Sequence, residues 1–350
     1  MLQVNDDLIR SVVSEVLGFM RTSPAGPAPA RSSRWGVYDN VDEAAQAASR
    51  DQKKFEAMGM SARKAAVDCV RKICIDRAEE LGREEFEETK IGRLAHKAQK
   101  LVVAGERTPG VEWLKTDAYT GEHGIALVEY APFGVVGIIT PVTHSLPTLA
   151  GNAINILAAG NALLCNPHPS GAKIACKGVR LFNQAIHAAI GLDSLLTIIE
   201  SPTLESAEAI FQHREVRLIC VTGGPAVGRA ALRSPKRAIV AGPGNPPVVV
   251  DETADLDNAA RSIIAGAAYD NNLLCIGEKE VFAVASIFDD LMSAMERAGA
   301  VRLNATQIDA LTKAAFPKEG DKLVLHKDLI GVDAAVLAAK AGMKIPASTE

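Results

Sequence analysis

Hydrophobic and polar positions change their spacing several times along the chain, and each change marks a segment. Over residues 1–20, apolar side chains recur every three to four positions while polar side chains take the opposite face, which predicts an amphipathic helix. Residues 21–34 are rich in Pro, Ala and Ser, a composition typical of a flexible linker. The predicted helix therefore either packs on its own domain or docks in the groove of a partner.

A long helical region and a series of buried strands follow the linker. Helical spacing runs from residue 41 to residue 103, where the sequence offers no candidate chemistry. Beyond it, continuous apolar runs alternate with helical patterns, which predicts an α/β fold with a doubly wound parallel sheet. The predicted strands cover residues 135–140, 161–166, 195–199, 216–221, 237–241 and 247–250.

Two segments depart from this alternation. Residues 117–130 are rich in turn-forming residues and predict a β-hairpin arm. After residue 251 the pattern restarts, with a predicted helix at 255–268 and a strand at 280–284. We therefore expect three parts after the linker: residues 35–116 and 132–250 as one domain, residues 117–131 as an arm, and residues 251–350 as a second domain.

Composition and charge exclude several classes of function. A formal net charge of −4 argues against a dedicated nucleic-acid binder. The six cysteines show no metal-binding spacing, so we expect no metal site and five buried free thiols, as in a reducing compartment. No apolar run is long enough to span a membrane and no secretory signal is present, so we expect a cytoplasmic location without membrane binding.

Cys275 is the leading candidate for a catalytic residue. It lies in the run Tyr-Asp-Asn-Asn-Leu-Leu-Cys-Ile-Gly-Glu-Lys-Glu over residues 269–280, whose last four residues predict the start of a helix. The positive end of a helix dipole would favour the thiolate, which is the nucleophilic form of cysteine. A lone cysteine is more often an inert core residue, so the case for a catalytic Cys275 has to come from other segments of the chain.

A glycine-rich turn follows the strand predicted at 216–221. The run Thr-Gly-Gly-Pro-Ala-Val-Gly over residues 222–228 joins that strand to a helix, whose free amides favour an anion. It does not match GxGxxG, and a nucleotide site and a tight packing turn are about equally good interpretations. Its position after a strand of an α/β sheet favours the nucleotide site.

Two other turns follow predicted strands. Thr143 and His144 offer hydrogen-bond donors that could hold a developing oxyanion, although simple capping of the next helix explains them equally well. Residues 166–170, Asn-Pro-His-Pro-Ser, could face the same crevice or form only a rigid turn held by two prolines.

Several motifs together resemble a known family. They are Gly-Asn-Ala at 160–162, Thr-Gly-Gly-Pro at 222–225, Gly-Asn-Pro-Pro at 244–247, Asp-Glu-Thr-Ala-Asp-Leu at 251–256 and the Cys275 run. This combination resembles the aldehyde dehydrogenase superfamily. It is most similar to the CoA-acylating branch, the propionaldehyde and acetaldehyde dehydrogenases of bacterial microcompartments. The resemblance covers residues 41–350.

The resemblance implies a Rossmann-like NAD domain, an α/β catalytic domain and a small β-arm that joins subunits into a homo-oligomer. It implies that Cys275 attacks a short-chain aldehyde. The backbone amide of Cys275 would hold the alkoxide together with His144 or Thr143, where the family usually has Asn. The residues expected to contact NAD are Thr140, Pro141, Asn166, Pro167, His168, Thr222, Gly223, Gly224, Val227, Gly228, Ala241 and Gly242.

The resemblance also concerns the release of product. Hydrolytic relatives carry a glutamate that activates water where this chain has Ala-Gly-Pro-Gly at residues 241–244. Without a base, a thioester on Cys275 would persist until the thiol of coenzyme A arrives. Residues 1–20 resemble the signals that dock enzymes to microcompartment shell proteins, which implies a location in the microcompartment lumen.

Two alternatives to this function stay open. One is a hydrolytic aldehyde dehydrogenase. The other is an inactive, truncated microcompartment cargo protein, because members of the family continue well past the position of Glu350.

Overall fold

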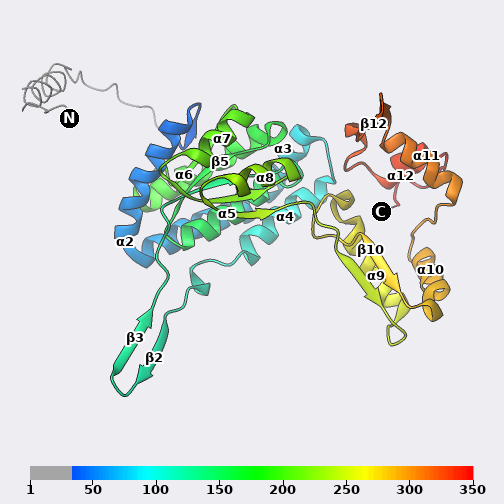
Figure 1. Ribbon diagram of the computed structural model, residues 1–350, viewed down its shortest axis with the longest axis horizontal. Helices are drawn as coiled ribbons and strands as arrows, with labels where there is room; N and C mark the ends of the chain where they lie inside the picture. Colours follow the sequence, from blue (N-terminus) through cyan, green and yellow to red (C-terminus); the bar gives the residue numbers. More distant parts are fainter. Residues whose placement is uncertain (1–33, 350) are drawn as a thin grey trace, which may run out of the picture. The chain divides into compact units, whose positions relative to one another are not determined.

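The computed structural model describes residues 34–349 of the chain (Figure 1). The helix expected at residues 1–20 and all but the last residue of the expected linker 21–34 lie outside the described residues. Within residues 34–349, no helix combines the length and the apolar character needed to cross a membrane.

A six-stranded parallel sheet forms the centre of the fold. Its strand order is β1-β6-β5-β4-β7-β8, and every neighbouring pair is parallel. The strands are β1 (Val37–Tyr38), β4 (Val135–Ile139), β5 (Ala162–Asn166), β6 (Leu196–Ile199), β7 (Val216–Thr222) and β8 (Arg237–Ala241). All residues of β4, β5 and β6 are buried, as expected for continuous apolar runs. The predicted doubly wound parallel sheet is confirmed.

Helices cover both faces of this sheet because the direction of winding reverses between β4 and β7. The helix α2 packs against α4, α5 and α6, whereas α7 and α8 contact strands β7 and β8 and their neighbours (Figure 1). The helices are α2 (Val41–Asp76), α3 (Ala78–Thr89), α4 (Leu94–Arg107), α5 (Ser145–Ala158), α6 (Ala172–Ile190), α7 (Leu204–Gln212) and α8 (Pro225–Arg233).

Local sequence signals set the ends of these helices. The Asn40 side chain accepts hydrogen bonds from the amides of Asp42 and Glu43 at the start of α2. Thr203 and Ser206 form a reciprocal capping box at the start of α7. Phe55, Phe182 and Phe211, from α2, α6 and α7, are among the largest fully buried side chains. These helices are therefore held mainly by apolar packing on the sheet.

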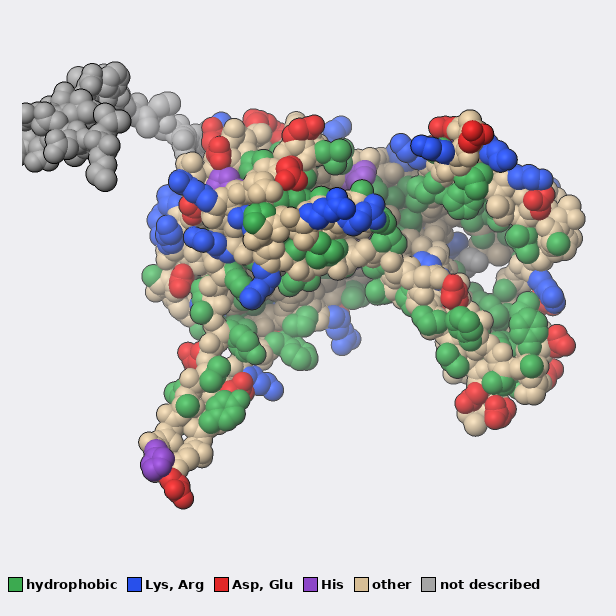
Figure 2. Space-filling model, in the orientation of Figure 1, with side chains coloured by type: hydrophobic (Ala, Val, Ile, Leu, Met, Phe, Trp, Pro, Cys, Tyr) green, Lys and Arg blue, Asp and Glu red, His purple; other side chains and the backbone are tan. Residues whose placement is uncertain are grey.

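The hairpin expected at residues 117–130 is present. Strands β2 (Asp117–Gly121) and β3 (Gly124–Val128) pair antiparallel, and every residue in both strands is exposed. Hydrophobic side chains lie along the hairpin (Figure 2), and Ile125 is 72% exposed. The hairpin therefore buries none of its apolar residues within residues 34–349.

A second, smaller core follows the large sheet. Strand β9 (Pro247–Val250) pairs parallel with β10 (Glu280–Ala283), not with the six-stranded sheet. Val250, Ile263 and Leu291 form its buried centre. The sequence boundary at residue 250 assigned β9 to the first domain, whereas its pairing joins it to the second core.

The remaining elements complete the second part and the connections. They are α9 (Leu256–Ala268), α10 (Phe288–Arg297), α11 (Ala305–Ala315), α12 (Ala334–Lys340), β11 (Lys318–Glu319) and β12 (Lys322–Leu323). Single 3-10 turns are η1 (Val111–Trp113), η2 (Pro169–Gly171), η3 (Tyr269–Asn272), η4 (Ala285–Ile287) and η5 (Lys327–Leu329).

Candidate active site

The carboxyl ends of β4 and β7 form the point where the strand order reverses, which is where α/β sheets bind ligands. Thr140 and Pro141 follow β4, whereas Thr222 is the last residue of β7 and Gly223 follows it. The next residue, Gly224, is the N-cap of α8 and makes no side-chain capping bond. The first amides of α8 therefore face the end of the sheet at which an anion such as a pyrophosphate would bind.

Two of the expected cofactor residues use their side chains inside the protein. Thr140 is buried, and its Oγ1 lies 3.9 Å from the Sγ of Cys165. Asn166 is also buried and accepts a hydrogen bond of 2.5 Å from the hydroxyl of Ser206, while its amide donates to the Thr203 carbonyl. The side chains of these two residues are therefore engaged within the protein.

The other expected cofactor residues lie at the same end of the sheet. His168 is exposed, and its Nδ1 accepts a hydrogen bond from the amide of Ser170, whereas Pro167 is buried. A Cβ on Gly228 would lie 2.9 Å from a methyl of Val240, so this glycine lets α8 approach β8. Val227 lies in α8, Ala241 is the last residue of β8, and Gly242 follows it.

Cys275 lies in a turn and not at the start of a helix. The Gly-Glu-Lys-Glu run does not begin a helix as the sequence predicted, because its last residue starts strand β10 and pairs with β9. The proposed activation by a helix dipole is therefore wrong. The Cys275 side chain is exposed and open to reactants.

A lysine supplies positive charge to this turn instead. The Nζ of Lys279 donates hydrogen bonds to the carbonyls of Leu274, at 3.0 Å, and Gly277, at 3.3 Å. It also donates to the side-chain oxygen of Asn272, at 2.8 Å. The ammonium thus closes the loop on both sides of Cys275 and fixes its backbone.

The turn at residues 241–247 lies directly against Cys275. A Cβ on Gly244 would lie 2.1 Å from the Cys275 carbonyl oxygen, so only glycine fits there. The amide of Lys279 donates to the Pro246 carbonyl at 3.1 Å. Residues 269–279 carry the candidate nucleophile Cys275 and form what we call the nucleophile loop. Because residues 241–247 contain no acid or base, this neighbouring turn cannot activate water.

His144 is the N-cap residue of α5 and is half-buried. Its Nδ1 lies 2.9 Å from the hydroxyl of Thr148. Burial, and then the positive charges of Lys100 and Lys97, hold the pKa of His144 well below its usual value. The ring is therefore neutral at neutral pH, with one nitrogen engaged by Thr148 and the other able to donate a hydrogen bond.

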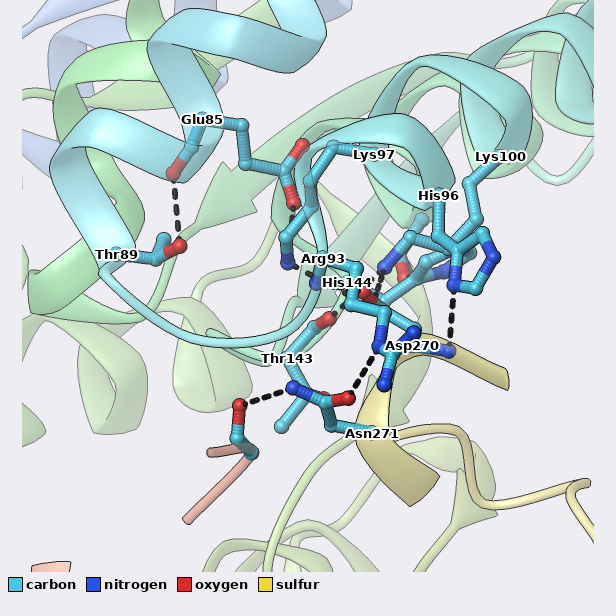
Figure 3. A network of polar contacts seen from close by, with 12 residues as sticks. Glu85, Thr89, Arg93, His96, Lys97, Lys100, Thr143, His144, Asp270 and Asn271 are labelled. Atoms are coloured by element: carbon cyan, nitrogen blue, oxygen red, sulfur yellow. Dashed lines mark hydrogen bonds and ion pairs between the residues drawn. The ribbon is translucent and has the colours of Figure 1, made fainter. Parts of the chain in front are cut away.

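Sequence reasoning missed a group of charged residues beside His144. Figure 3 shows Lys97 and Lys100 from α4, Glu85 from α3 and Asp270 from the nucleophile loop meeting in the interior. The sequence singled out no candidate residue in residues 41–103 and did not indicate this buried cluster. The available signal was the spacing of Lys97 and Lys100, which lie three residues apart on one helix face.

A model of the aldehyde dehydrogenase family matches residues 21–314. The chain belongs to the aldehyde dehydrogenase family. It is 40% identical over 350 residues to the acetaldehyde dehydrogenase (acetylating) EutE of Salmonella typhimurium, covering 99% of this chain and 74% of that protein. It is 35% identical over 342 residues to the propanal dehydrogenase (CoA-propanoylating) of Citrobacter freundii, covering 98% and 72%.

Solved structures of such enzymes share this fold. A propionaldehyde dehydrogenase of Rhodopseudomonas palustris with bound propionyl-CoA superposes with a TM-score of 0.86 at 38% identity, covering 94% of this chain and 73% of that one. A propionaldehyde dehydrogenase from the fucose utilisation bacterial microcompartment of Clostridium phytofermentans gives a TM-score of 0.84 at 40% identity, covering 89% and 71%. The predicted fold and the resemblance to the CoA-acylating branch are thus confirmed.

The six thiols differ in burial: three are buried, Cys69 and Cys220 are half-buried, and the expectation of five buried thiols thus holds for three. Burial raises the pKa of Cys74 and of Cys176 to about 12 and also raises the pKa values of Cys69, Cys165 and Cys220. Cys275 is the exposed cysteine of this set.

We expect iodoacetamide at neutral pH to alkylate Cys275 at least about tenfold faster than any other cysteine, because a thiolate is the reactive form. Peptide mass spectrometry over a time course measures each rate, and the other five thiols are internal controls. Equal rates at Cys275 and at Cys69 or Cys220 would contradict the assignment of a reactive thiol.

Proposed function

We propose that this chain is an NAD-dependent CoA-acylating aldehyde dehydrogenase, which converts a short-chain aldehyde, CoA and NAD to acyl-CoA and NADH. One observation carries the proposal. The exposed Cys275 thiol lies in a loop against which residues 241–247 pack without an acid or base. A thioester formed there has no neighbouring base in that turn to hydrolyse it. The relatives named as acetylating and CoA-propanoylating support the same chemistry.

The reaction begins with attack of the Cys275 sulfur on the aldehyde carbon, which forms a hemithioacetal alkoxide. The backbone amide of Cys275 and the side chain of His144 donate hydrogen bonds to this alkoxide. When the alkoxide collapses, a bound NAD would accept the hydride from the former aldehyde carbon, which leaves an acyl thioester on the sulfur. The CoA thiolate attacks this thioester, releases acyl-CoA and restores the Cys275 thiolate.

His144 serves better than Thr143 as the second oxyanion donor. The Thr143 carbonyl already accepts a hydrogen bond from Lys100 at 3.3 Å, which fixes the backbone of that turn. The neutral imidazole of His144 has one nitrogen held by Thr148 and a second nitrogen that can donate. A neutral donor needs no proton transfer when the alkoxide forms, so it is ready in the ground state.

The dinucleotide would bind at the carboxyl ends of β4 and β7, where the strand order reverses. The amides at the start of α8, after Thr222, Gly223 and Gly224, would hold its pyrophosphate. The turn at Asn166, Pro167 and His168 would contact the adenosine side. A relative described as an engineered glycolyl-CoA reductase has bound NADP+, so either dinucleotide is a reasonable probe.

We expect NADH formation from propanal or acetaldehyde to require CoA and to yield acyl-CoA. Absorbance at the NADH band with product analysis measures both, and Cys275→Ala should reduce the rate to background. Release of free acid without CoA would support the hydrolytic alternative. No NADH under any of these conditions, in a folded chain, would support the inactive cargo protein.

His144→Ala should lower kcat by about 10²-fold or more, since it removes an oxyanion donor. His144→Asn should retain activity within about tenfold of the unchanged chain, because an amide also donates a hydrogen bond. The two variants are measured in the same NADH assay. Equal losses in both would remove His144 from the reaction.

We propose that residues 1–20 dock the chain to a microcompartment shell protein, and that the β2–β3 hairpin joins subunits of a homo-oligomer. The amphipathic spacing of residues 1–20 and the microcompartment origin of the relative from Clostridium phytofermentans support the first. The exposed apolar residues Tyr119, Ile125 and Leu127 support the second.

Deletion of residues 1–20 should abolish co-purification with assembled shells and leave CoA-dependent NADH formation unchanged. Affinity capture of the shells followed by activity assay measures both properties. Loss of solubility on deletion would instead indicate that this segment packs on its own domain.

A further inference from the structure

Two lysines and two carboxylates are buried together between α3, α4 and the nucleophile loop (Figure 3). Lys100 Nζ lies 2.5 Å from Asp270 Oδ2, and Lys97 Nζ lies 3.7 Å from both Asp270 Oδ2 and Glu85 Oε1. The side chains of Glu85, Lys97 and Asp270 are fully buried, and that of Lys100 is 3% exposed. The formal charges of these four residues cancel, which makes their burial possible.

Such a cluster is a poor way to gain stability. Moving ions out of water costs several kcal/mol for each ion, and well-packed apolar residues often replace buried ion pairs without loss. The directions of the pKa shifts agree with this cost, since burial raises the pKa of Glu85 and lowers the pKa of Lys100. This cost indicates that the cluster has a role other than stabilising the fold.

Asp270 starts a strained segment that leads to Cys275. Asp270, Asn271 and Asn272 have φ angles of 50°, 55° and 59°, in the left-handed region that favours glycine. Three such residues in a row cost about 1–2 kcal/mol each, although Asp and Asn tolerate this conformation best. The segment keeps this shape only if contacts around it hold every residue.

Hydrogen bonds hold each of the three residues. Asp270 accepts from the Arg93 amide at 2.8 Å, and its own amide donates to the Nδ1 of His96 at 2.9 Å. The Asn271 amide group donates to the Gly331 carbonyl. That of Asn272 donates to one carbonyl in the last turn of α9 and to the Glu278 carbonyl. A Cβ on Gly92 would lie 2.3 Å from Asp270 Oδ1, so this glycine admits the carboxylate.

Lys100 also holds the other half of the proposed site. Its Nζ donates both to Asp270 Oδ2 and to the carbonyl of Thr143, at 3.3 Å, next to His144. One buried ammonium thus joins the start of the nucleophile loop to the turn that carries the oxyanion donor. We propose that Lys100 and Asp270 are positioning residues, which fix Cys275 relative to His144 through this shared contact.

Lys97 provides a matched control. It lies one turn earlier on α4 and has the same charge and burial, but its Nζ makes no hydrogen bond and does not contact Thr143. Lys97→Met and Lys100→Met leave the cluster with the same net charge. The two variants therefore differ in the bridge between the two turns and not in the charge removed.

The test compares Lys100→Met, Lys97→Met and Asp270→Asn in the full chain. Hydrogen exchange of residues 140–146 and 269–277 reports the order of the two turns, and circular dichroism confirms folding. Steady-state kinetics with propanal, NAD and CoA separates kcat from the KM for CoA. We expect Lys100→Met to speed exchange in both segments at least fivefold and to lower kcat at least tenfold, with the KM for CoA changed less than threefold.

We expect Lys97→Met to change exchange and kcat less than Lys100→Met does, and Asp270→Asn to affect residues 269–277 most. Equal effects of the two lysine variants, or unchanged exchange in folded Lys100→Met, would overturn the assignment. If Lys100→Met does not fold, Asp270→Asn is compared with Lys97→Met instead. The assignment then requires faster exchange of residues 269–277 in Asp270→Asn than in Lys97→Met.

The kinetic part of this test rests on the proposed function, whereas hydrogen exchange does not. If the unchanged chain forms no NADH, the proposed function is refuted. If exchange still becomes faster in both turns of Lys100→Met, the positioning role is retained.

Discussion

The ion pair between Lys100 and Asp270 is the contact on which the geometry of the candidate site depends. Helix α4 is packed into the main core through residues such as Leu101 and Ala98, which are almost completely buried, so Lys100 has little freedom to move. Asp270, in contrast, lies in the loop between α9 and β10, which both belong to the second core. Breaking a buried pair by removing one partner costs about 3–5 kcal/mol, because the other charge remains buried without compensation. That penalty is of the same order as the cost of the strained backbone at residues 270–272, so the pair can hold the loop on the helix.

The elements that could be predicted from sequence are those whose pattern is local. Strands β4, β5 and β6 are apolar without interruption because helices cover both faces, and such runs are visible in any single sequence. The turns after β4 and β7 could be brought to one crevice because parallel strands end at the same edge. Cys275 could be selected as a candidate from its neighbours in the chain.

The features that could not be predicted depend on contacts between distant segments. A strand at residues 280–284 could be predicted, but its parallel pairing with β9, in which Glu280 lies opposite Pro247, could not. Lys97 and Lys100 look like solvent-facing residues of an amphipathic helix, and their burial follows only from an aspartate 170 residues away from Lys100. Burial, and then the charges of these two lysines, hold the pKa of His144 below its usual value, which no local pattern indicates.

The location of the cluster, away from the thiol, follows from what the proposed reaction needs. Cys275 has to be reached in turn by a small aldehyde and by the much larger CoA, so its surroundings must stay open, as its exposure shows. Hydrogen bonds made beside an exposed thiol would compete with water and contribute little to its position. An anchor five residues earlier in the chain, inside the protein, avoids this competition. Lys279 then needs only to close the short loop between Asn272 and Gly277. Rigidity is thus supplied from the buried side of the loop, and access is preserved on the other side.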